Sequence, residues 1–502
     1  MNRRDFIKLS ATSTAAGLVG AAAPTIAAEP AASSPGAFPK VADVTKYVAE
    51  FVTNTSYADL PEDVLALGKK SILDGLGLAL ASGRSKGNEI LLAYIRSLGV
   101  PNAGATVLGT PHLLPARFAA LANGVAIHME DFDDTQLAVA KDRVYGLLTH
   151  PTVTVLPAVL GLAEMAHLNG KDTLLAYHLG VEVECKLAEA TSPRSYGDGF
   201  HSTGVFGVIG SAVGCAKLKG FDLHRTMRTI AIAATHAGGL RENFGTLCKP
   251  LQAGQGAEGG VIAAELAALG WDGAESILEA NNGFFHAYGG SYDPSALMGK
   301  LGAPWTFASP GISIKPHPSG SLTHPGMTEI LRLIRTKGIK PEEVEKVDVG
   351  TNSMNQSTLI HHQPKTGLQA KFSMEYFIAA CLVRGKAGLA EFTDEAVNQP
   401  DVQAMVRRVH FYVDPAAEKA GFSKMTTIIN VHLKDGQTIT GEADFGKGSP
   451  SNPMNFDEVA EKFRGCASFV GWPKANADRL IDRVAHFDEL RDVEEISQLC
   501  RD

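Results

Sequence analysis

The sequence lacks the features of several large classes of protein. Its six cysteines include no Cys-x-x-Cys pair; they are Cys185, Cys215, Cys248, Cys381, Cys466 and Cys500. This spacing argues against an iron–sulfur cluster or a structural zinc site. Lysine and arginine total 46 against 54 aspartate and glutamate residues, which gives a net charge of -8. The chain therefore has no overall basic field for a nucleic-acid backbone, and nucleic acid is not an expected partner.

Composition instead indicates a globular protein. Of its 502 residues, 45% are apolar and 20% are charged. Such a chain can bury a large core and is expected to divide into two or more domains. Beyond the N-terminal region we find no internal repeat and no low-complexity tract.

The N-terminal region has the pattern of an export signal. Arg3 and Arg4 precede a mildly apolar run from Leu9 to Ala28 that is rich in small residues. This combination predicts a twin-arginine signal peptide over residues 1–28, cleaved near the end of the run. A membrane anchor is the alternative, but the run is weakly apolar for a stable span. We therefore expect a periplasmic protein that uses the twin-arginine export machinery and has no stable membrane insertion after processing.

Apolar spacing predicts helices through most of the chain. A Pro/Ala/Ser-rich linker over residues 29–39 is followed by helical spacing to about residue 309, as in Asp59–Ala81 and Arg117–His128. The many Ala and Gly residues on these helices indicate closely packed helix pairs.

Short β-branched segments follow residue 310, at Val347–Gly350 and His410–Val413. Thr426–Leu433 and Gln437–Ile439 flank Lys-Asp-Gly, which is typical of a β-hairpin. A helix is expected at Phe372–Arg384. The predicted fold class is thus mainly α with an inserted α+β lid domain. The expected domains are a helical domain of residues 40–309 plus 451–502 and a lid domain of residues 310–450.

The densest polar cluster follows the predicted helix that ends at His128. It contains Asp131, Asp133 and Asp134. Three aspartates so close to one another are able to bind a divalent ion, which would make the protein a metal-dependent enzyme. The alternative is that Asp133 and Asp134 cap a helix and Asp131 is buried in hydrogen bonds. We find no second aspartate-rich segment, and we predict no metal.

Three histidines and two lysines have settings that suit a functional site. His150, His201 and His324 lie in turn-like sequences, and histidine is the side chain best suited to carry protons near neutral pH. Lys249 and Lys315 each precede a proline, which fixes the backbone and is able to aim an ammonium group inward. The alternatives are structural histidines and solvated lysines. A polyanionic substrate would need such cations.

Seven segments share their order and spacing with a known family. They are Asn123–Thr135, His150-Pro-Thr, Gly199–Gly204, Gly239–Thr246, Lys249-Pro-Leu, Lys315-Pro-His-Pro and Phe372–Tyr376. Together they resemble the MmgE/PrpD family of 2-methylcitrate dehydratases and cis-aconitate decarboxylases, over about residues 40–470. The resemblance implies a helical domain, a smaller α+β lid, a cleft between them and a homodimer.

The resemblance also implies the site residues. The expected catalytic residues are Asp131, His150, His201, Lys249, Lys315 and Tyr376. The expected substrate-binding residues are Thr135, which the resemblance implies, and Arg241, which lies beside the family's site positions in its motif. Gln252 and His324 are added to them, Gln252 from its place after Lys249-Pro-Leu and His324 from its turn-like setting. Removing a proton alpha to a carboxylate builds charge that fixed cations stabilise, and the two lysines suit that role. A histidine would be the base or the acid, oriented by Asp131, and Tyr376 would protonate a departing hydroxide or hold a carboxylate.

The chain departs from the family in three places. Residues 136–149 form a longer link than is usual between Thr135 and His150. Gln252 and Gly320 stand where histidines are common, Gly320 where decarboxylase-like members carry one. Both changes remove proton-transfer capacity, so decarboxylation of cis-aconitate is less expected.

The predicted function is therefore that of a cofactor-independent hydro-lyase, a dehydratase acting on a small hydroxylated di- or tricarboxylate such as 2-methylcitrate. An epimerase, isomerase or decarboxylase of a polycarboxylate is the nearest alternative, because each begins with chemistry at the same carbon. An exported carboxylate-binding protein without catalysis is the alternative from a different class.

Overall fold

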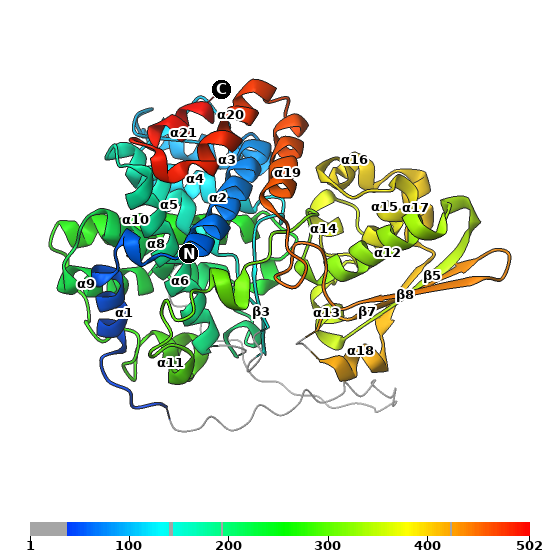
Figure 1. Cartoon of the computed structure of the whole chain (residues 1–502), viewed down its shortest axis with the longest axis horizontal. Helices are drawn as coiled ribbons and strands as arrows, with labels where there is room; N and C mark the ends of the chain where they lie inside the picture. Colours follow the sequence, from blue (N-terminus) through cyan, green and yellow to red (C-terminus); the bar gives the residue numbers. More distant parts are fainter. Residues whose placement is uncertain (1–37, 140–143, 192–193, 422–423, 502) are drawn as a thin grey trace, which may run out of the picture. The chain divides into compact units, whose positions relative to one another are not determined.

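Helices make up most of the chain, and a small sheet lies in its C-terminal part (Figure 1). The computed structural model describes residues 38–139, 144–191, 194–421 and 424–501, and side chains outside residues 137–148. The predicted signal peptide and nearly all of the predicted linker lie outside the described residues. The expected fold class, mainly α with a smaller α+β part, is confirmed.

Six helices build the first apolar core. They are α2 (Glu62–Ser82), α4 (Ala116–His128), α5 (Pro151–Met165), α6 (Gly170–Thr191), α8 (Ser202–Leu218) and α10 (Cys248–Ala268). Their small residues permit close packing: a Cβ added to Gly124 of α4 would meet the Cα of Gly254 in α10 at 2.8 Å. This close approach brings the end of α4 beside the start of α10, where His128 and Lys249 lie.

Further helices surround this core. They are α1 (Val44–Asn54), α3 (Lys86–Ser97), α7 (Arg194–Gly197), α9 (Leu223–Ala234) and α11 (Phe284–Gly289). The chain returns to the same core at its C-terminal end with α19 (Phe456–Phe469), α20 (Lys474–Ala485) and α21 (Glu494–Leu499). Phe463 of α19 packs against Gly77 of α2, and both Phe463 and Leu76 belong to this core.

A four-stranded sheet holds the second apolar core. Its strands are β5 (Val344–Thr351), β6 (Val409–Val413), β7 (Thr427–Leu433) and β8 (Thr438–Ala443). Their order is β6-β5-β7-β8, with β5 and β6 parallel and the other pairs antiparallel. The predicted β-hairpin is the β7–β8 pair. The inward residues alternate along β7, so that Ile429 and Val431 are buried with Val347 of β5.

Helices α12 (His324–Lys337) and α15 (Met374–Arg384) lie on the same side of this sheet (Figure 1). Short helices complete this part of the chain. They are α13 (Ser353–Thr358), α14 (Gly367–Ala370), α16 (Asp394–Val397), α17 (Pro400–Val406) and α18 (Pro415–Ala420). Met327 of α12 and Phe377 of α15 are buried in the second core.

The long link between Thr135 and His150 folds back on itself. It forms an antiparallel pair of strands, β3 (Gln136–Val139) and β4 (Val144–Thr149), in which Gln136 pairs with Thr149. Because this pairing closes the link at its base, Thr135 and His150 stay adjacent despite the extra residues. A second short pair joins β1 (Ala105–Thr106) to β2 (Leu113–Leu114).

All six cysteines are free thiols, and five of them are buried. Across the described residues, the helices are either too short or too polar to span a lipid bilayer.

Candidate active site

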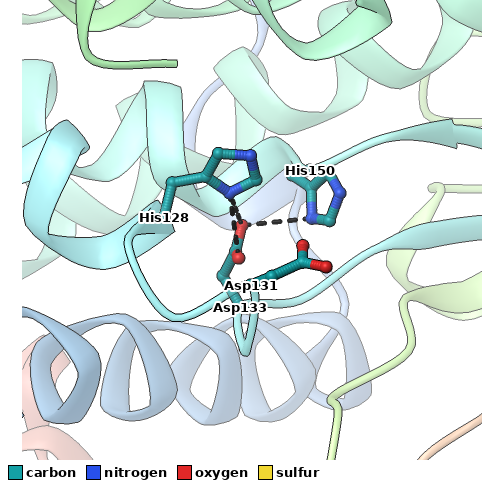
Figure 2. A group of neighbouring side chains, drawn as sticks. All are labelled: His128, Asp131, Asp133 and His150. Carbon is teal, nitrogen blue, oxygen red and sulfur yellow. Dashed lines mark hydrogen bonds and ion pairs between the residues drawn. The ribbon is translucent and has the colours of Figure 1, made fainter. Parts of the chain in front are cut away.

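The turn after α4 places two aspartates on the inner side of the chain. Asp131 has a φ of 47°, in the left-handed region that aspartate tolerates better than most residues. This sharp turn directs Asp131 and Asp133 toward His128 and His150 (Figure 2). All four side chains are buried, so their charges interact strongly.

Two ammonium groups converge on Asp131. Lys249 Nζ lies 2.7 Å from Asp131 Oδ1, and Lys315 Nζ lies 3.0 Å from the same oxygen and 2.9 Å from the Asp131 backbone carbonyl. Burial by itself would raise the pKa of Asp131, but the two ammonium groups outweigh it and hold that pKa well below its usual range. Burial lowers the pKa of Lys249, which Asp131 partly counteracts.

Asp133 lies between two histidines. His128 Nδ1 is 3.0 Å and 2.9 Å from its two carboxylate oxygens, and His150 Nδ1 is 3.1 Å from Oδ2 (Figure 2). The other nitrogen of His128, Nε2, is 2.9 Å from Lys249 Nζ. Burial lowers the pKa of His128 to about 4, although Asp133 opposes that shift. His128 is therefore neutral near neutral pH.

His201 is held by Gln252 and not by Asp133. Its Nδ1 is 2.8 Å from Gln252 Oε1, and Gln252 Nε2 donates to the carbonyl of Leu240 at 3.2 Å. Its Nε2 is buried and has no hydrogen-bond partner among the described residues. Burial and the nearby Lys249 ammonium hold the pKa of His201 well below its usual value, so this imidazole is also neutral.

Five of the six expected catalytic residues line one pocket. The pocket has about 450 Å³ of empty space, its open mouth included. The five residues are Asp131, His150, His201, Lys249 and Lys315. The rings of Phe244 and Phe372 form part of the wall. Two lysines and one aspartate give this lining a charge of +1 (two positive, one negative), which favours an anionic ligand.

Three helices begin at the pocket. His150 and His201 are the N-cap residues of α5 and α8, and Lys249 is in the first turn of α10. Helix N-termini carry a partial positive charge and free N–H groups, and they favour anions. The sequence pattern did not predict this convergence, because helix starts far apart in the chain meet only in the folded protein.

Tyr376 does not lie in this pocket. It is the third residue of α15 and packs in the second core, with its ring 5.4 Å from that of Phe392. Its hydroxyl donates to the Glu391 carbonyl. The face of α15 that carries Tyr376 packs in the interior of the α+β part, so the structure does not bring this side chain together with the other five expected catalytic residues.

Two expected substrate-binding residues instead support residues of the pocket. The Arg241 guanidinium stacks on the ring of Tyr196, 3.9 Å from its centroid, and donates to the Tyr196 carbonyl at 2.9 Å. Tyr196 itself lines the pocket. Gln252 contacts His201 as described above. The sequence predicted that both would contact the substrate directly. In the structure each contacts a residue that lines the pocket instead.

Thr135 and His324 lie close to the pocket without lining it. The Thr135 hydroxyl is 3.3 Å from His150 Nδ1 and 3.4 Å from the Ser321 hydroxyl. His324 lines a second pocket, which shares Lys315 and Ser321 with the first. Burial holds the pKa of His324 well below its usual value.

The aspartate cluster separates into two parts. Asp134 faces Thr152 in the first turn of α5, accepting from its hydroxyl at 2.6 Å and its N–H at 3.2 Å, as a helix cap does. Burial raises the pKa of Asp134 to about 7. The capping interpretation therefore holds for Asp134, while Asp133 contacts histidines.

Two histidines and two aspartates lie close enough together to bind a metal ion, if distance is the only criterion. One ligand atom from each of His128, Asp131, Asp133 and His150 lies within 4.8 Å of the others. However, Lys249 Nζ already binds both His128 Nε2 and Asp131 Oδ1, at 2.9 Å and 2.7 Å. An ammonium at this point repels a metal ion, so we interpret the group as a hydrogen-bonded network of protein charges.

These observations define a buried, cationic pocket equipped for acid–base chemistry on an anion. The MmgE/PrpD N-terminal domain matches residues 46–297, and the MmgE/PrpD C-terminal domain matches residues 317–486. The chain belongs to the MmgE/PrpD family, as the motifs predicted.

Curated relatives span nearly the full length of the chain. It is 29% identical over 469 residues to cis-aconitate decarboxylase of Homo sapiens, which covers 91% of this chain and 94% of that protein. Identity to cis-aconitate decarboxylase of Mus musculus is 28% over 473 residues, covering 91% and 93%. Identity to cis-aconitate decarboxylase of Aspergillus terreus is 25% over 484 residues, covering 91% and 95%. A decarboxylase is a lyase, so these relatives share that class of reaction.

Proposed function

We propose that this protein is a cofactor-independent lyase that acts on a small polycarboxylate through proton transfer at the carbon alpha to a carboxylate. One observation carries the proposal: two buried ammonium groups, Lys249 and Lys315, share a pocket with the unpartnered Nε2 of His201. Names of the relatives support the lyase class and a tricarboxylate substrate.

Substrate binding follows from the charges of the pocket. A carboxylate that enters it exchanges water for Lys249, Lys315 and the N-termini of α5, α8 and α10. Preorganised donors in a water-poor site stabilise negative charge more strongly than water does. The same donors are in place when charge develops on that carboxylate as the neighbouring C–H bond breaks.

His201 is the proposed base. The Gln252 oxygen only accepts hydrogen bonds, so the nearby Nδ1 of His201 must carry its hydrogen. The lone pair is therefore on Nε2, which has no hydrogen-bond partner among the residues that the structure describes. Nε2 takes the proton alpha to the substrate carboxylate, and the imidazolium that results is able to protonate the leaving group.

The favoured outcome is loss of water. The C–H electron pair forms the new carbon–carbon double bond, the C–O bond breaks, and hydroxide leaves as water with the proton from the imidazolium. Gly320 supports this choice because it lines the pocket without a side chain that could deliver a proton elsewhere. Decarboxylation is the second candidate, which the names of the relatives favour.

The test uses the purified protein in heavy water with 2-methylcitrate, citrate and cis-aconitate. Magnetic resonance spectra follow substrate loss and deuterium uptake, and trapped carbon dioxide reports decarboxylation. Alkene formation from a hydroxy acid supports the hydro-lyase, and carbon dioxide from cis-aconitate supports the second candidate. Deuterium uptake without net loss would indicate an epimerase. Binding with no reaction on any of the three acids would contradict an enzymatic role.

We also propose that the protein is exported to the periplasm and forms a homodimer. The support for export is the Arg3-Arg4 pair and the apolar run after it. Cell fractionation should find the protein in the periplasm, and replacement of both arginines by lysine should retain it in the cytoplasm. Light scattering of the purified protein measures its mass and tests the dimer.

A further inference from the structure

We propose that Asp133 is a positioning residue that fixes both His128 and His150 with their hydrogen on Nδ1, which leaves His150 Nε2 as a second proton acceptor in the pocket. The catalytic part of this inference rests on the proposed function. The tautomers themselves do not, and they are measured separately below.

The contacts of His150 determine where its hydrogen lies. Its Nδ1 is 3.1 Å from Asp133 Oδ2, 3.0 Å from the Asp134 carbonyl and 3.3 Å from the Thr135 hydroxyl. A carboxylate and a carbonyl only accept hydrogen bonds, so Nδ1 must be the donor. In the neutral ring the lone pair is then on Nε2. Because His150 lines the pocket, that lone pair is available to a substrate proton.

The partners of both ring nitrogens of His128 indicate the same tautomer. Nδ1 faces the two oxygens of Asp133, which accept, and Nε2 faces the ammonium of Lys249, which donates. A neutral ring satisfies both partners only with its hydrogen on Nδ1. His128 therefore holds Lys249 by accepting from it, while Asp131 accepts from the same ammonium at 2.7 Å.

Asp133 is thus shared, and both histidines depend on it. Its carboxylate is 1% exposed and accepts from two donors at once. Both Nδ1 atoms lie near Oδ2, at 2.9 Å and 3.1 Å, so an asparagine oxygen at that position can still accept from both rings. Its NH₂ group then takes the place of Oδ1, 3.0 Å from His128 Nδ1, and opposes a hydrogen on that nitrogen. His150 is still tied to the Asp134 carbonyl, so His128 is the ring expected to turn its hydrogen to Nε2. That hydrogen would then oppose the Lys249 ammonium, which Asp131 still holds at 2.7 Å.

Other charges near these rings remain in place when Asp133 is replaced. The groups that face the two histidines are Lys249, Lys315 and Asp131, together with the neighbouring ring of His201. Asp74→Asn is a matched control, because it also removes a buried carboxylate. The partner of Asp74 is Lys462, at 2.5 Å, and not a histidine.

The direct test is magnetic resonance of the full chain with isotope-labelled histidine, because the ring nitrogen shifts distinguish the two neutral tautomers. His128→Gln and His150→Gln variants assign the signals. In the wild type we expect hydrogen on Nδ1 of both rings. In Asp133→Asn we expect His128 to change, whereas Asp74→Asn should leave both rings unaltered. Hydrogen on Nε2 of His150 in the wild type would overturn the inference, whether or not Asp133→Asn folds.

Kinetics provide the second readout. Replacing the carboxylate that orients a catalytic histidine by asparagine reduces kcat by about 10⁴ in a well-known triad, through the wrong tautomer. Here we expect Asp133→Asn to lower kcat by at least about a hundredfold with little change in KM. Asp133→Glu, which keeps the carboxylate, should recover part of that loss. Equal turnover in Asp133→Asn and wild type would contradict the positioning role. If no acid is turned over, the resonance measurement alone decides.

Discussion

Lys249 Nζ lies 2.7 Å from Asp131 Oδ1, and each of the two side chains is more than nine-tenths buried. A buried carboxylate needs such a partner, since an unpaired charge in the interior is strongly unfavourable. Lys315 provides a second ammonium on the same oxygen. Because the carboxylate is shared, one positive charge in this group is left over for substrate.

Removal of Lys249 should therefore impair catalysis more than folding. Lys249→Ala leaves Asp131 paired with Lys315 but removes the excess charge from the pocket. We expect kcat/KM to fall by at least about a hundredfold, as when one preorganised donor is removed from an anionic transition state. Lys474→Ala, at a side chain that is 83% exposed, is the control and should have wild-type rates. Similar rates in both variants would contradict the proposed role.

Gln252→Glu should change the pH dependence of the reaction. A carboxylate beside Nδ1 favours the imidazolium form of His201, so its pKa rises. Since the base must be neutral, the acid limb of kcat/KM should move to higher pH. His201→Ala should lower turnover by at least about a hundredfold and abolish this shift. An unmoved acid limb in Gln252→Glu would exclude His201 as the base that titrates there.

Gly320→His tests the link between this position and the bond that breaks. A Cβ at Gly320 would meet its nearest neighbours at 3.7 to 3.9 Å, which is ordinary contact, and φ is −54°. The added imidazole is therefore expected to fit and to supply a proton donor. Carbon dioxide release from cis-aconitate should increase in Gly320→His and stay at the wild-type level in Gly320→Ala. Equal release from all three proteins would show that this position does not select the reaction.

The buried Glu189 should make stability depend on pH. Burial raises its pKa to about 7 in the folded protein, despite the nearby ammonium of Lys186. A carboxyl with a raised pKa favours folding when protonated, so its contribution is lost as the pH rises through the folded pKa. Glu189→Gln keeps the oxygen that accepts from Gln136 at 2.7 Å. We expect equal Tm values at about pH 5 and a higher Tm for the variant at about pH 8. A constant difference across that range would be evidence against this assignment.

Exhaustive chelation should leave turnover unchanged. Lys249 Nζ lies 2.9 Å from His128 Nε2 and 2.7 Å from Asp131 Oδ1, so an ammonium already stands beside two of the four side chains that are close enough to bind a metal. Activity is measured before and after dialysis against a chelator, and again after divalent ions are restored. Activity that disappears and returns with the ion would replace the network interpretation with a metal centre.

Sequence patterns predicted the fold class, the β7–β8 hairpin and the five pocket residues identified by motif. They did not predict which atoms meet. Lys249 and Lys315 contact Asp131 across 118 and 184 residues of chain, and periodicity carries no information about partners at such distances. The pattern placed Asp133 in a polar cluster, but only the folded chain shows that it lies between two histidines.

Tyr376 shows that predicting a helix does not predict what each of its side chains contacts. The helix that contains it was predicted at Phe372–Arg384, and its side chain was expected to contact the substrate. Which face of α15 points to the substrate depends on how the helix packs, because residues at successive positions on a helix point in different directions. Its hydroxyl donates to Glu391, within the α+β part of the chain.

The pairing of β3 with β4 makes the positions of Thr135 and His150 independent of the length of the link between them. Gln136 pairs with Thr149, so the link leaves and rejoins the rest of the chain at two fixed positions. Residues can be gained or lost in this link without moving Thr135 or His150, because the entropic cost of closing a loop rises only slowly with its length. The length of this link can thus change while His150 stays in place.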